Sequence, residues 1–405
     1  MEGHFAGRVD AARAGTHAQI DLDALSSNVG ALLARLPDGV ELMAVVKANA
    51  YGHGLVPCAR QALAAGAGRL AVARIDEGLL LRAAGFTAPV LALGPANPAL
   101  ASRAARGGVA VTVGSVAGAR ALHAGLGSDD PALDVHIKVD TGMHRYGVEP
   151  TEAVALARAV SGDARLRLEG LFTHFATADE ADGAFLHEQA RRFAGVRRAL
   201  AAAGLAPPLV HLANSAAALR GVVEPAGDLP GRPLVRAGLL LYGLSPSAHI
   251  PAPAAFRPVM TLLTRVARVF TLPAGEGVSY GLTFTADRPL RCATLPIGYG
   301  DGLSRRLSNQ GWAAVSGSAC PIRGRVCMDQ TVVEVESAPA VAEGDVAVML
   351  GTAPAMSAED AARLGGTINY EVVTAISARV PRVYLRGGRA VAVSDLFGLL
   401  EVPAT

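Results

Sequence analysis

Lysine is almost absent from this 405-residue chain, which has 37 lysine and arginine residues but only two lysines, Lys47 and Lys138. An amine can lose its proton, form a Schiff base or take up carbon dioxide, whereas a guanidinium stays charged. Lys47 closes the apolar run 44–46 and opens a glycine-rich turn, which is where a nucleophile is expected. Chance survival during a drift toward arginine is an equal alternative for Lys138 and a much weaker one for Lys47.

Cysteine is also scarce. The four cysteines, Cys58, Cys292, Cys320 and Cys327, form no C-x-x-C pair. This scatter argues against a zinc ribbon and against a disulfide scaffold, and it fits free thiols in a reducing cytoplasm. We therefore expect no metal site.

Long apolar runs and an excess of charge are missing as well. The run 234–244 is short and interrupted by Arg236 and Gly238, and the first twenty residues lack the apolar segment of a signal peptide. The formal net charge is +2, so no basic surplus calls for nucleic acid or a membrane surface. These features predict a globular protein of the cytoplasm, with no nucleic-acid or membrane partner.

The first 245 residues alternate short apolar runs with alanine- and leucine-rich segments at helical spacing. Eight such β-then-α units favour a (β/α)8 barrel, and no G-x-G-x-x-G follows the first run, which disfavours a dinucleotide-binding sheet. The predicted strands are 42–47, 70–74, 90–93, 109–113, 133–139, 166–172, 209–212 and 234–241. The predicted helices include 56–65, 75–84, 151–160 and 185–202.

The pattern changes after Ser245, where a proline-rich linker, 246–253, precedes closely spaced strand-like runs separated by glycine and proline. We expect an α/β protein: an N-terminal extension without regular structure (1–17), a TIM-type barrel (18–245) and a mainly β domain (246–405). The predicted strands of the β domain are 260–270, 292–296, 313–315, 331–336, 346–350 and, last, 382–385, with helices at 357–364 and 369–376.

Polar side chains follow the ends of several predicted barrel strands, where barrel enzymes carry their active sites. In chain order they are Lys47, Arg145, His174, Asn214 with Ser215, and Arg236 with Gly238. A serine hydroxyl and free backbone N–H groups beside a glycine can hold phosphate. An amine facing a phosphate site suggests pyridoxal 5′-phosphate (PLP) bound as a Schiff base. Tyr280 lies on a turn of the β domain, and its phenol could act as a base.

Nine short motifs occur in order along the chain: 46–54, 140–143, 173–176, 213–215, 242–244, 278–281, 296–302, 325–330 and 368–371. With these motifs the chain resembles the alanine racemases, PLP-dependent enzymes that consist of a barrel and a C-terminal β domain. The resemblance extends from about residue 18 to residue 391. It implies interconversion of L- and D-alanine in the cytoplasm, supplying D-alanine for peptidoglycan.

The resemblance also implies roles for individual residues. Lys47 corresponds to the Schiff-base lysine and the base on the D face, and Tyr280 of the other subunit to the base on the L face. Arg236 corresponds to the partner of the pyridine nitrogen. His174 would bridge Arg236 and Tyr280 and place positive charge near the phenol.

Further correspondences concern the cofactor, the substrate and its entrance. Arg145 and the Met328 backbone N–H match contacts to the substrate carboxylate, and Lys138 matches a lysine that is often carbamylated; an unmodified amine is the alternative. The phosphate site is implied to consist of Tyr51, Ser215, Tyr370 and the backbone at Gly238 and Leu239. The substrate channel is implied to pass Tyr299, Tyr370, Asp179, Arg305, Arg325 and Asp329. A homodimer follows if Met328, Tyr299 and Tyr280 act across subunits.

Three alternatives remain open. A racemase of the same fold could act on serine, on lysine or on a broad range of amino acids, although paired tyrosines at the gate favour a small side chain. PLP-carrying binding proteins consist of a single barrel and lack the β domain with Tyr280. Amino-acid decarboxylases with a barrel and a β domain carry a different glycine-rich phosphate motif.

Overall fold

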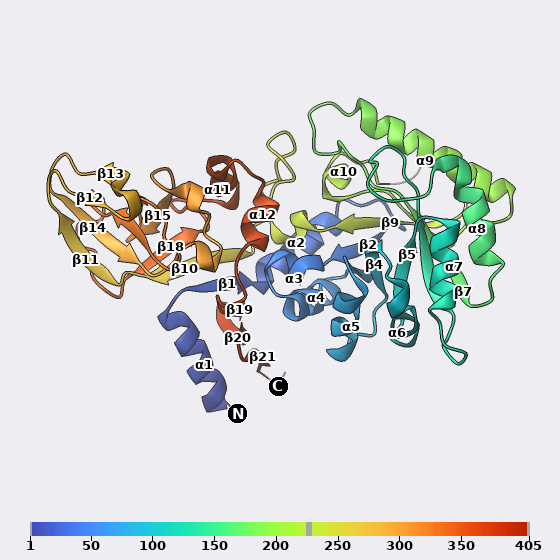
Figure 1. Ribbon diagram of the computed structural model, residues 1–405, viewed down its shortest axis with the longest axis horizontal. Coiled ribbons are helices and arrows are strands. Elements are labelled where there is room, and N and C mark those ends of the chain that lie inside the picture. Colours follow the sequence, from blue (N-terminus) through green and yellow to red (C-terminus); the bar gives the residue numbers. More distant parts are fainter. Residues whose placement is uncertain (1, 224–228, 403–405) are drawn as a thin grey trace.

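A closed parallel barrel and a mainly β domain lie side by side in the computed structural model, which describes residues 2–223 and 229–402 (Figure 1). Residues 224–228 of the expected barrel, and residues 1 and 403–405 at the ends of the chain, lie outside the described part. The predicted fold class, a TIM-type barrel followed by a mainly β domain, is confirmed.

Eight parallel strands form the barrel, and the last of them closes against the first. They are β2 (Glu41–Val45), β3 (Arg69–Val72), β4 (Val90–Pro95), β5 (Val109–Val113), β6 (Leu133–Lys138), β7 (Leu166–Phe172), β8 (Leu209–His211) and β9 (Arg232–Ala237). Strands such as β5 are near-continuous apolar runs, as expected of strands that are covered on both faces, whereas β6, β7 and β9 also carry charged residues. All eight predicted strands are found, but the last ends at Ala237, where the chain turns into a short 3-10 helix, Leu239–Tyr242.

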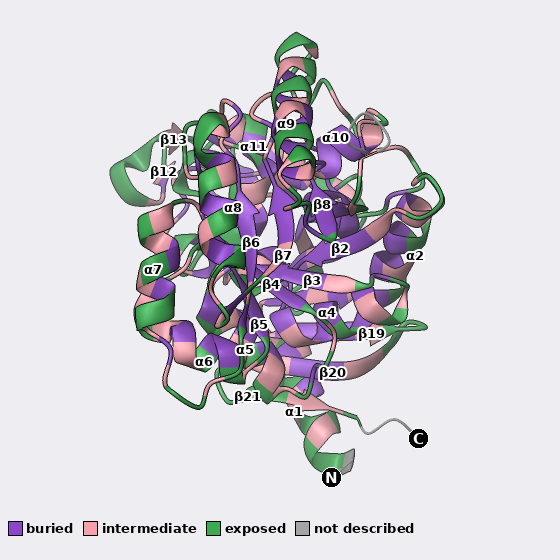
Figure 2. Cartoon of the chain, turned by 90° about the vertical axis from the view of Figure 1, so that its right-hand side faces the viewer, coloured by how far each residue is buried: buried purple, intermediate pink, exposed green. Residues whose placement is uncertain are grey.

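Helices surround the barrel, with buried residues facing the strands and exposed residues facing outward (Figure 2). The longest, α9 (Ala184–Ala202), buries Leu186, Phe193 and Leu200 at helical spacing. The other helices of this half are α2 (Leu22–Leu33), α3 (Lys47–Tyr51), α4 (Leu55–Ala64), α5 (Ile75–Ala83), α6 (Ala101–Arg106), α7 (Val116–Ala124), α8 (Ala153–Ser161) and α10 (Ser215–Leu219), with 3-10 turns at Pro98–Leu100 and Pro150–Glu152. No helix within residues 2–223 and 229–402 has the length and apolar content needed to cross a bilayer.

The second domain is built around an eight-stranded sheet with the order β16-β15-β18-β10-β1-β19-β20-β21. Its strands are β16 (Ser318–Pro321), β15 (Trp312–Val315), β18 (Val346–Leu350), β10 (Met260–Arg265), β1 (His17–Asp21), β19 (Arg382–Arg386), β20 (Arg389–Asp395) and β21 (Gly398–Glu401). Smaller sheets contain β11 (Arg268–Leu272), β14 (Leu290–Leu295) and β17 (Thr331–Glu334), and β12 (Gly277–Val278) with β13 (Phe284–Thr285). Helices α11 (Ala358–Gly365) and α12 (Asn369–Thr374) and 3-10 turns at Tyr280–Leu282, Tyr299–Asp301 and Arg305–Leu307 complete it.

The N-terminal segment differs from the expectation in two ways. Residues 2–14, expected without regular structure, form helix α1, whose Val9 and Ala12 pack on Val383 and Val393 of the large sheet. Residues 18–21, expected to belong to the barrel domain, are part of strand β1, which lies between β10 and β19 of the second domain. The barrel itself begins only at β2. Pairing between strands so distant in the sequence leaves no local pattern in the chain.

Two predicted strands of the second domain also need correction. The run 260–270 is two strands, β10 and β11, which belong to different sheets. Strand β19 is not the last one, because the two-residue turn Gly387-Gly388, with φ of 54° and 71°, leads into β20. Two glycines at positive φ are typical of a tight hairpin.

The two domains meet beside Lys47. Helix α12 packs against α3, and a side chain at Gly52 would come within 2.1 Å of the Val373 carbonyl oxygen. The buried guanidinium of Arg382 donates to the carbonyl oxygens of Gly52, Ile376 and Val380. The β domain therefore holds the turn that follows Lys47.

Candidate active site

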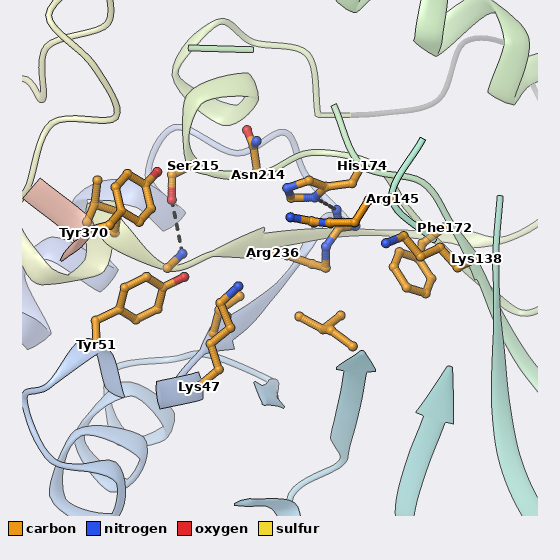
Figure 3. A pocket seen from close by; sticks show the side chains of 14 residues that line it. Lys47, Tyr51, Lys138, Arg145, Phe172, His174, Asn214, Ser215, Arg236 and Tyr370 are labelled. Carbon is orange, nitrogen blue, oxygen red and sulfur yellow. Dashed lines mark hydrogen bonds between the residues drawn. The ribbon is translucent and has the colours of Figure 1, made fainter. Parts of the chain in front are cut away.

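A cavity opens at the C-terminal ends of the barrel strands (Figure 3). It brings together ten of the residues for which the resemblance implies a role, which the sequence spreads over more than 300 positions. The lining residues are Val45, Lys47, Tyr51, Leu93, Lys138, Arg145, Phe172, His174, Asn214, Ser215, Arg236, Gly238, Leu239 and Tyr370.

Lys47 follows β2 and begins an unusual turn. Residues 48–51, none of them glycine, have φ between 52° and 54°, in the left-handed region. Such a conformation costs roughly 1–2 kcal/mol per residue. The Glu77 carboxylate stabilises the turn, because it accepts hydrogen bonds from the backbone N–H groups of Ala48 and Ala73, both at 2.7 Å. Glu77 was not among the predicted site residues.

The amine of Lys47 lies in positive surroundings. Burial lowers the pKa of Lys47, and the cations of Arg145 and Arg236 lower it further, against a smaller opposing effect of Glu77. A lowered pKa increases the fraction of neutral amine, which is the nucleophilic form.

One end of the cavity is built to hold an anion. The Ser215 hydroxyl accepts a hydrogen bond from the Gly238 backbone N–H at 3.1 Å. A side chain at Gly238 would approach the Tyr51 hydroxyl to 2.3 Å, so only glycine leaves room for it. The ring of Tyr370, from α12, lies 6.1 Å from that of Tyr51. Two phenols, a hydroxyl and backbone N–H groups converge here.

Arg236, on β9, is buried at the opposite end. It donates to Nδ1 of His211 at 2.9 Å, to Nδ1 of His174 at 3.0 Å, and to the carbonyl oxygens of Thr173 and Leu212. It forms no salt bridge with any carboxylate in the described part of the chain. Burial lowers its pKa, but an arginine side chain keeps its charge at neutral pH.

His174 is neutral, contrary to the expectation that it brings positive charge. Burial lowers the pKa of His174 well below its ordinary value, and Arg236, Arg145 and both lysines lower it further. Because Nδ1 accepts from Arg236, the remaining proton must be on Nε2. The positive charge of this part of the site is on Arg236.

Lys138 ends β6 on the third side of the cavity. Its amine lies 5.8 Å from the centre of the Phe172 ring and 5.6 Å from that of Tyr146. Burial, followed by the cations of Arg145 and Arg236, lowers the pKa of Lys138 to about 8. Arg145 extends over the cavity between Lys138 and His174 (Figure 3).

Three predicted residues of the β domain are absent from the lining of this cavity. Tyr280 is 72% exposed, Met328 53% and Tyr299 43%. The loops of Tyr299 and Met328 are joined, since the N–H of Gly300 donates to the Met328 carbonyl at 2.8 Å. The Ser279 hydroxyl, beside Tyr280, donates to the Arg325 carbonyl at 2.6 Å. All three side chains are therefore presented on the surface.

The four remaining channel candidates are also outside the cavity lining. Asp329 pairs with Arg379 at 2.7 Å, and Arg305 is exposed on its 3-10 turn. The carbonyl of Asp179 accepts a hydrogen bond from the Ser247 hydroxyl. Arg325 lies beside Gly281, next to Tyr280.

Two family models cover most of the chain. The alanine racemase N-terminal domain matches residues 20–246, and the alanine racemase C-terminal domain matches residues 259–384. The chain belongs to the alanine racemase family. It is thus an amino-acid racemase by family, with the barrel as the N-terminal domain.

Individual members of the alanine racemase family agree with this assignment. The alanine racemase of Desulfovibrio desulfuricans is 44% identical, covering 91% of this chain and 97% of that protein. The alanine racemase of Geobacillus stearothermophilus is 42% identical, covering 96% and 98%. The crystal structure of alanine racemase from Bacillus anthracis with bound L-Ala-P superimposes with a TM-score of 0.87 at 39% identity, covering 95% of this chain and 98% of the other.

The structure adds residues that sequence reasoning missed. Besides Glu77, they are Phe172, which lines the cavity, and His211, whose ring stacks on Phe172 with centroids 4.6 Å apart. His211 and His136 are polar residues within apolar strands of a barrel that is covered on both faces. A histidine in a strand that is buried on both faces needs a hydrogen-bond partner, and this is the sequence signal that indicates both residues.

Proposed function

We propose that this racemase interconverts L- and D-alanine with PLP as cofactor. One observation carries the proposal: the Lys47 amine lies between an anion cradle and a buried, uncompensated guanidinium. PLP has a phosphate, an aldehyde and a pyridine nitrogen. Ser215, Tyr51, Tyr370 and the backbone at Gly238 and Leu239 fit the phosphate, Lys47 the aldehyde carbon, and Arg236 the nitrogen.

PLP, when bound, supplies an electron sink that lowers the cost of removing the proton at Cα. Inversion then needs two bases on opposite faces of Cα. Lys47 is one, because its lowered pKa allows its nitrogen to take and return a proton. We assign the other to Tyr280 of the partner subunit. Its exposure on its own chain supports this assignment, since the phenol is available to a second chain.

The remaining residues bind and orient the substrate. Arg145 and the Met328 N–H of the second chain suit the carboxylate of alanine. Tyr299 and Tyr370 would narrow the entrance to a small side chain. We propose that Asp179, Arg305, Arg325 and Asp329 line the outer part of the entrance.

Lys138 is proposed to carry a carbamate. A pKa of about 8 leaves part of the amine neutral near neutral pH, and that form reacts with carbon dioxide. The resulting anion would face Arg145 and hold it by a charge-assisted hydrogen bond.

The site proposed here is complete only in a homodimer. We also propose a cytoplasmic enzyme that supplies D-alanine for peptidoglycan. All four cysteines are free thiols, which fits a reducing compartment.

Mixing two inactive variants tests this function. Lys47→Ala and Tyr280→Phe each lack one base, and each should lose L-alanine racemisation by at least about 10²-fold. After co-refolding in equal amounts, the heterodimers should contain one intact site, so that about a quarter of all sites regain activity. A mixture as inactive as its components would contradict the shared site, and near-normal turnover of Tyr280→Phe alone would contradict the two-base mechanism.

A racemase with a different or broader substrate, such as serine or lysine, is the second candidate. Racemisation of L-alanine, L-serine, L-lysine and L-arginine under the same conditions separates the two. The tyrosines at the entrance predict that alanine gives the highest kcat/KM. A higher value for lysine would overturn the alanine assignment but not the fold or the bases.

A further inference from the structure

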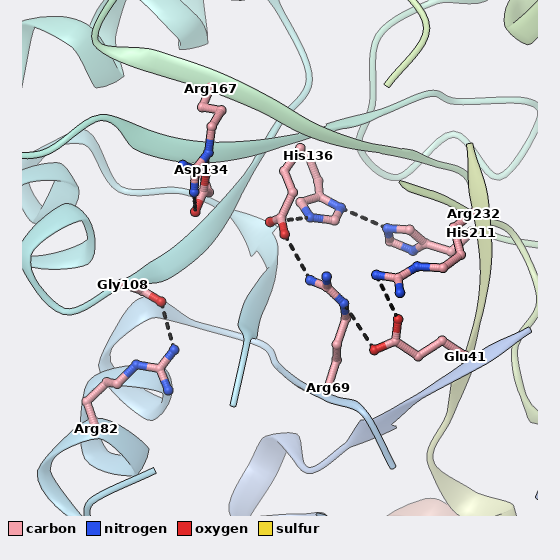
Figure 4. A network of polar contacts seen from close by, with 10 residues as sticks. Glu41, Arg69, Arg82, Gly108, Asp134, His136, Arg167, His211 and Arg232 are labelled. Carbon is pink, nitrogen blue, oxygen red and sulfur yellow. Dashed lines mark hydrogen bonds and ion pairs between the residues drawn. The ribbon is translucent and has the colours of Figure 1, made fainter. Parts of the chain in front are cut away.

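A chain of hydrogen bonds runs from Arg236 through the barrel interior, away from the cavity, and Figure 4 shows its far part with His211, His136 and Arg69. Arg236 meets Nδ1 of His211 at 2.9 Å, and Nε2 of His211 meets Nδ1 of His136 at 2.9 Å. Nε2 of His136 then meets the Glu169 carboxylate at 3.0 Å. The second oxygen of Glu169 accepts from Arg69 at 2.9 Å. The chain thus connects the cavity with the N-terminal ends of the strands.

The three hydrogen bonds between Arg236 and Glu169 must all point in one direction, toward the carboxylate. Arginine has only donors and a carboxylate only acceptors. His211 therefore accepts at Nδ1 and donates from Nε2, and His136 does the same toward Glu169. Both imidazoles are neutral and carry their proton on Nε2. Burial, and then the nearby Arg236, lower the pKa of His211 well below its ordinary value, which agrees with the neutral form.

The fold makes space for this chain. His136 and His211 are 1% and 0% exposed in the barrel interior. A side chain at Gly170 of β7 would come within 2.2 Å of Nδ1 of His136, so the glycine provides room for the imidazole. Phe172, on the same strand, stacks flat on His211 at an interplanar angle of 7°.

The orientation of the Arg236 guanidinium depends on the hydrogen-bond acceptors around it. Three of its four acceptors, Thr173, Leu212 and His174, meet the same nitrogen, Nη2. The other terminal nitrogen, Nη1, has only Nδ1 of His211. If His211 carried its proton on Nδ1 instead, two N–H groups would face each other and the guanidinium would have to turn.

We propose that His136 and Glu169 are positioning residues of this racemase: they fix the tautomer of His211 and thereby the orientation of Arg236 in the active site. Neither residue lines the active-site cavity. The inference rests on the proposed function, in which Arg236 meets the pyridine nitrogen.

Glu169→Gln tests the proposal at nearly constant shape. Arg69 can only donate, so it claims the single amide oxygen of the new side chain and turns the amide NH₂ toward His136. The hydrogen bonds between residue 169, His136 and His211 then point in the opposite direction, toward Arg236. The double variant Arg69→Met/Glu169→Gln removes the competing donor, so the amide oxygen can face His136 and the original direction is restored.

The readout is the proton position, measured by nitrogen-15 NMR of histidine-labelled holoenzyme, together with kcat/KM for L-alanine. In the wild type we expect the protons of His136 and His211 on Nε2. In Glu169→Gln we expect the His136 proton on Nδ1 and a fall in kcat/KM on the order of tenfold. The double variant should recover the proton of His136 on Nε2 and the wild-type kcat/KM, although it removes one more side chain.

Asp134→Asn is the matched control. Asp134 lies on the same strand as His136 but pairs with Arg167, which is not part of the hydrogen-bond chain (Figure 4). Its loss should therefore leave the tautomers of both histidines and kcat/KM unchanged. The proposal would be overturned if Glu169→Gln left the tautomers and kcat/KM unchanged, as this control does. It would also be overturned if kcat/KM of the double variant were lower than that of Glu169→Gln. The NMR result does not require turnover, so a wild type without racemisation would refute the proposed function and leave the tautomers measurable.

Discussion

Arg236 donates a hydrogen bond of 3.0 Å to Nδ1 of His174, and this bond fixes the proton of His174 on Nε2. The imidazole is therefore a neutral link that offers its one N–H away from Arg236. In the proposed two-base mechanism, the positive charge near the second base would be that of the guanidinium itself.

A neutral His174 predicts no contribution to the acid side of the pH profile. His174→Asn keeps an oxygen that can accept from Arg236 and removes the titrating ring. Because the pKa of His174 is far below its ordinary value, the acid limb of kcat/KM should stay at the same pH while the rate falls on the order of tenfold. A marked shift of the limb would show that His174 titrates. His123→Asn, at an exposed histidine, is the control.

Borohydride reduction should fix PLP onto Lys47. Lys138 is the only competing lysine of the chain, which makes the assignment by peptide mass unambiguous. We expect the adduct on the peptide that contains Lys47. We also expect that the absorbance of Lys47→Ala above 400 nm is about as low as that of the cofactor-free protein. An adduct on Lys138 would reverse the roles of the two lysines.

Gly238→Ala should weaken cofactor binding. The new methyl would lie 2.3 Å from the Tyr51 hydroxyl, which therefore has to leave the anion cradle. We expect the Kd for PLP, measured by fluorescence titration, to rise on the order of tenfold or more. Gly30→Ala is the control, because no atom lies within 4 Å of the added methyl. Equal Kd values for PLP in the two variants would show that Gly238 is not part of the anion cradle.

The stability of the protein should depend on Glu169 in acid. Burial by itself raises the pKa of Glu169, but hydrogen bonds from His136 and Arg69, together with the positive charge of Arg69, outweigh it and lower the pKa below its ordinary value. A depressed carboxyl pKa stabilises the folded state above the ordinary value, and this stabilisation is lost as the pH falls toward the folded value. The difference in urea unfolding free energy between wild type and Glu169→Gln should shrink between about pH 5 and pH 3. A difference independent of pH would contradict this.

Carbamylation of Lys138 can be detected directly. The neutral amine attacks carbon dioxide, an N–C bond forms and one proton leaves to solvent. With carbon-13 bicarbonate the wild type should show a carbamate NMR signal, and Lys138→Arg should lack it, because a guanidinium does not react. Identical spectra for both proteins would leave Lys138 as an unmodified amine.

Much of the barrel could be predicted because its elements are local. Strands such as β5, Val109–Val113, are continuous runs of buried, mostly β-branched residues and are visible without any tertiary contact. Strand β1 could not be assigned to its sheet, since its partners β10 and β19 lie more than 230 residues away. The hairpin at Gly387-Gly388 carries a local signal, because two consecutive glycines favour a tight turn.

The sequence by itself singled out Lys47: with two lysines among 37 basic residues, and one of them at the end of a strand, it predicts an amine with a chemical role there. Only the tertiary structure decided the charges around it. Burial and hydrogen-bond direction make His174 neutral, lower the pKa of Lys138 and place His136 and His211 in line behind Arg236. These properties depend on distances of a few ångströms between different strands, and no spacing along the chain encodes them.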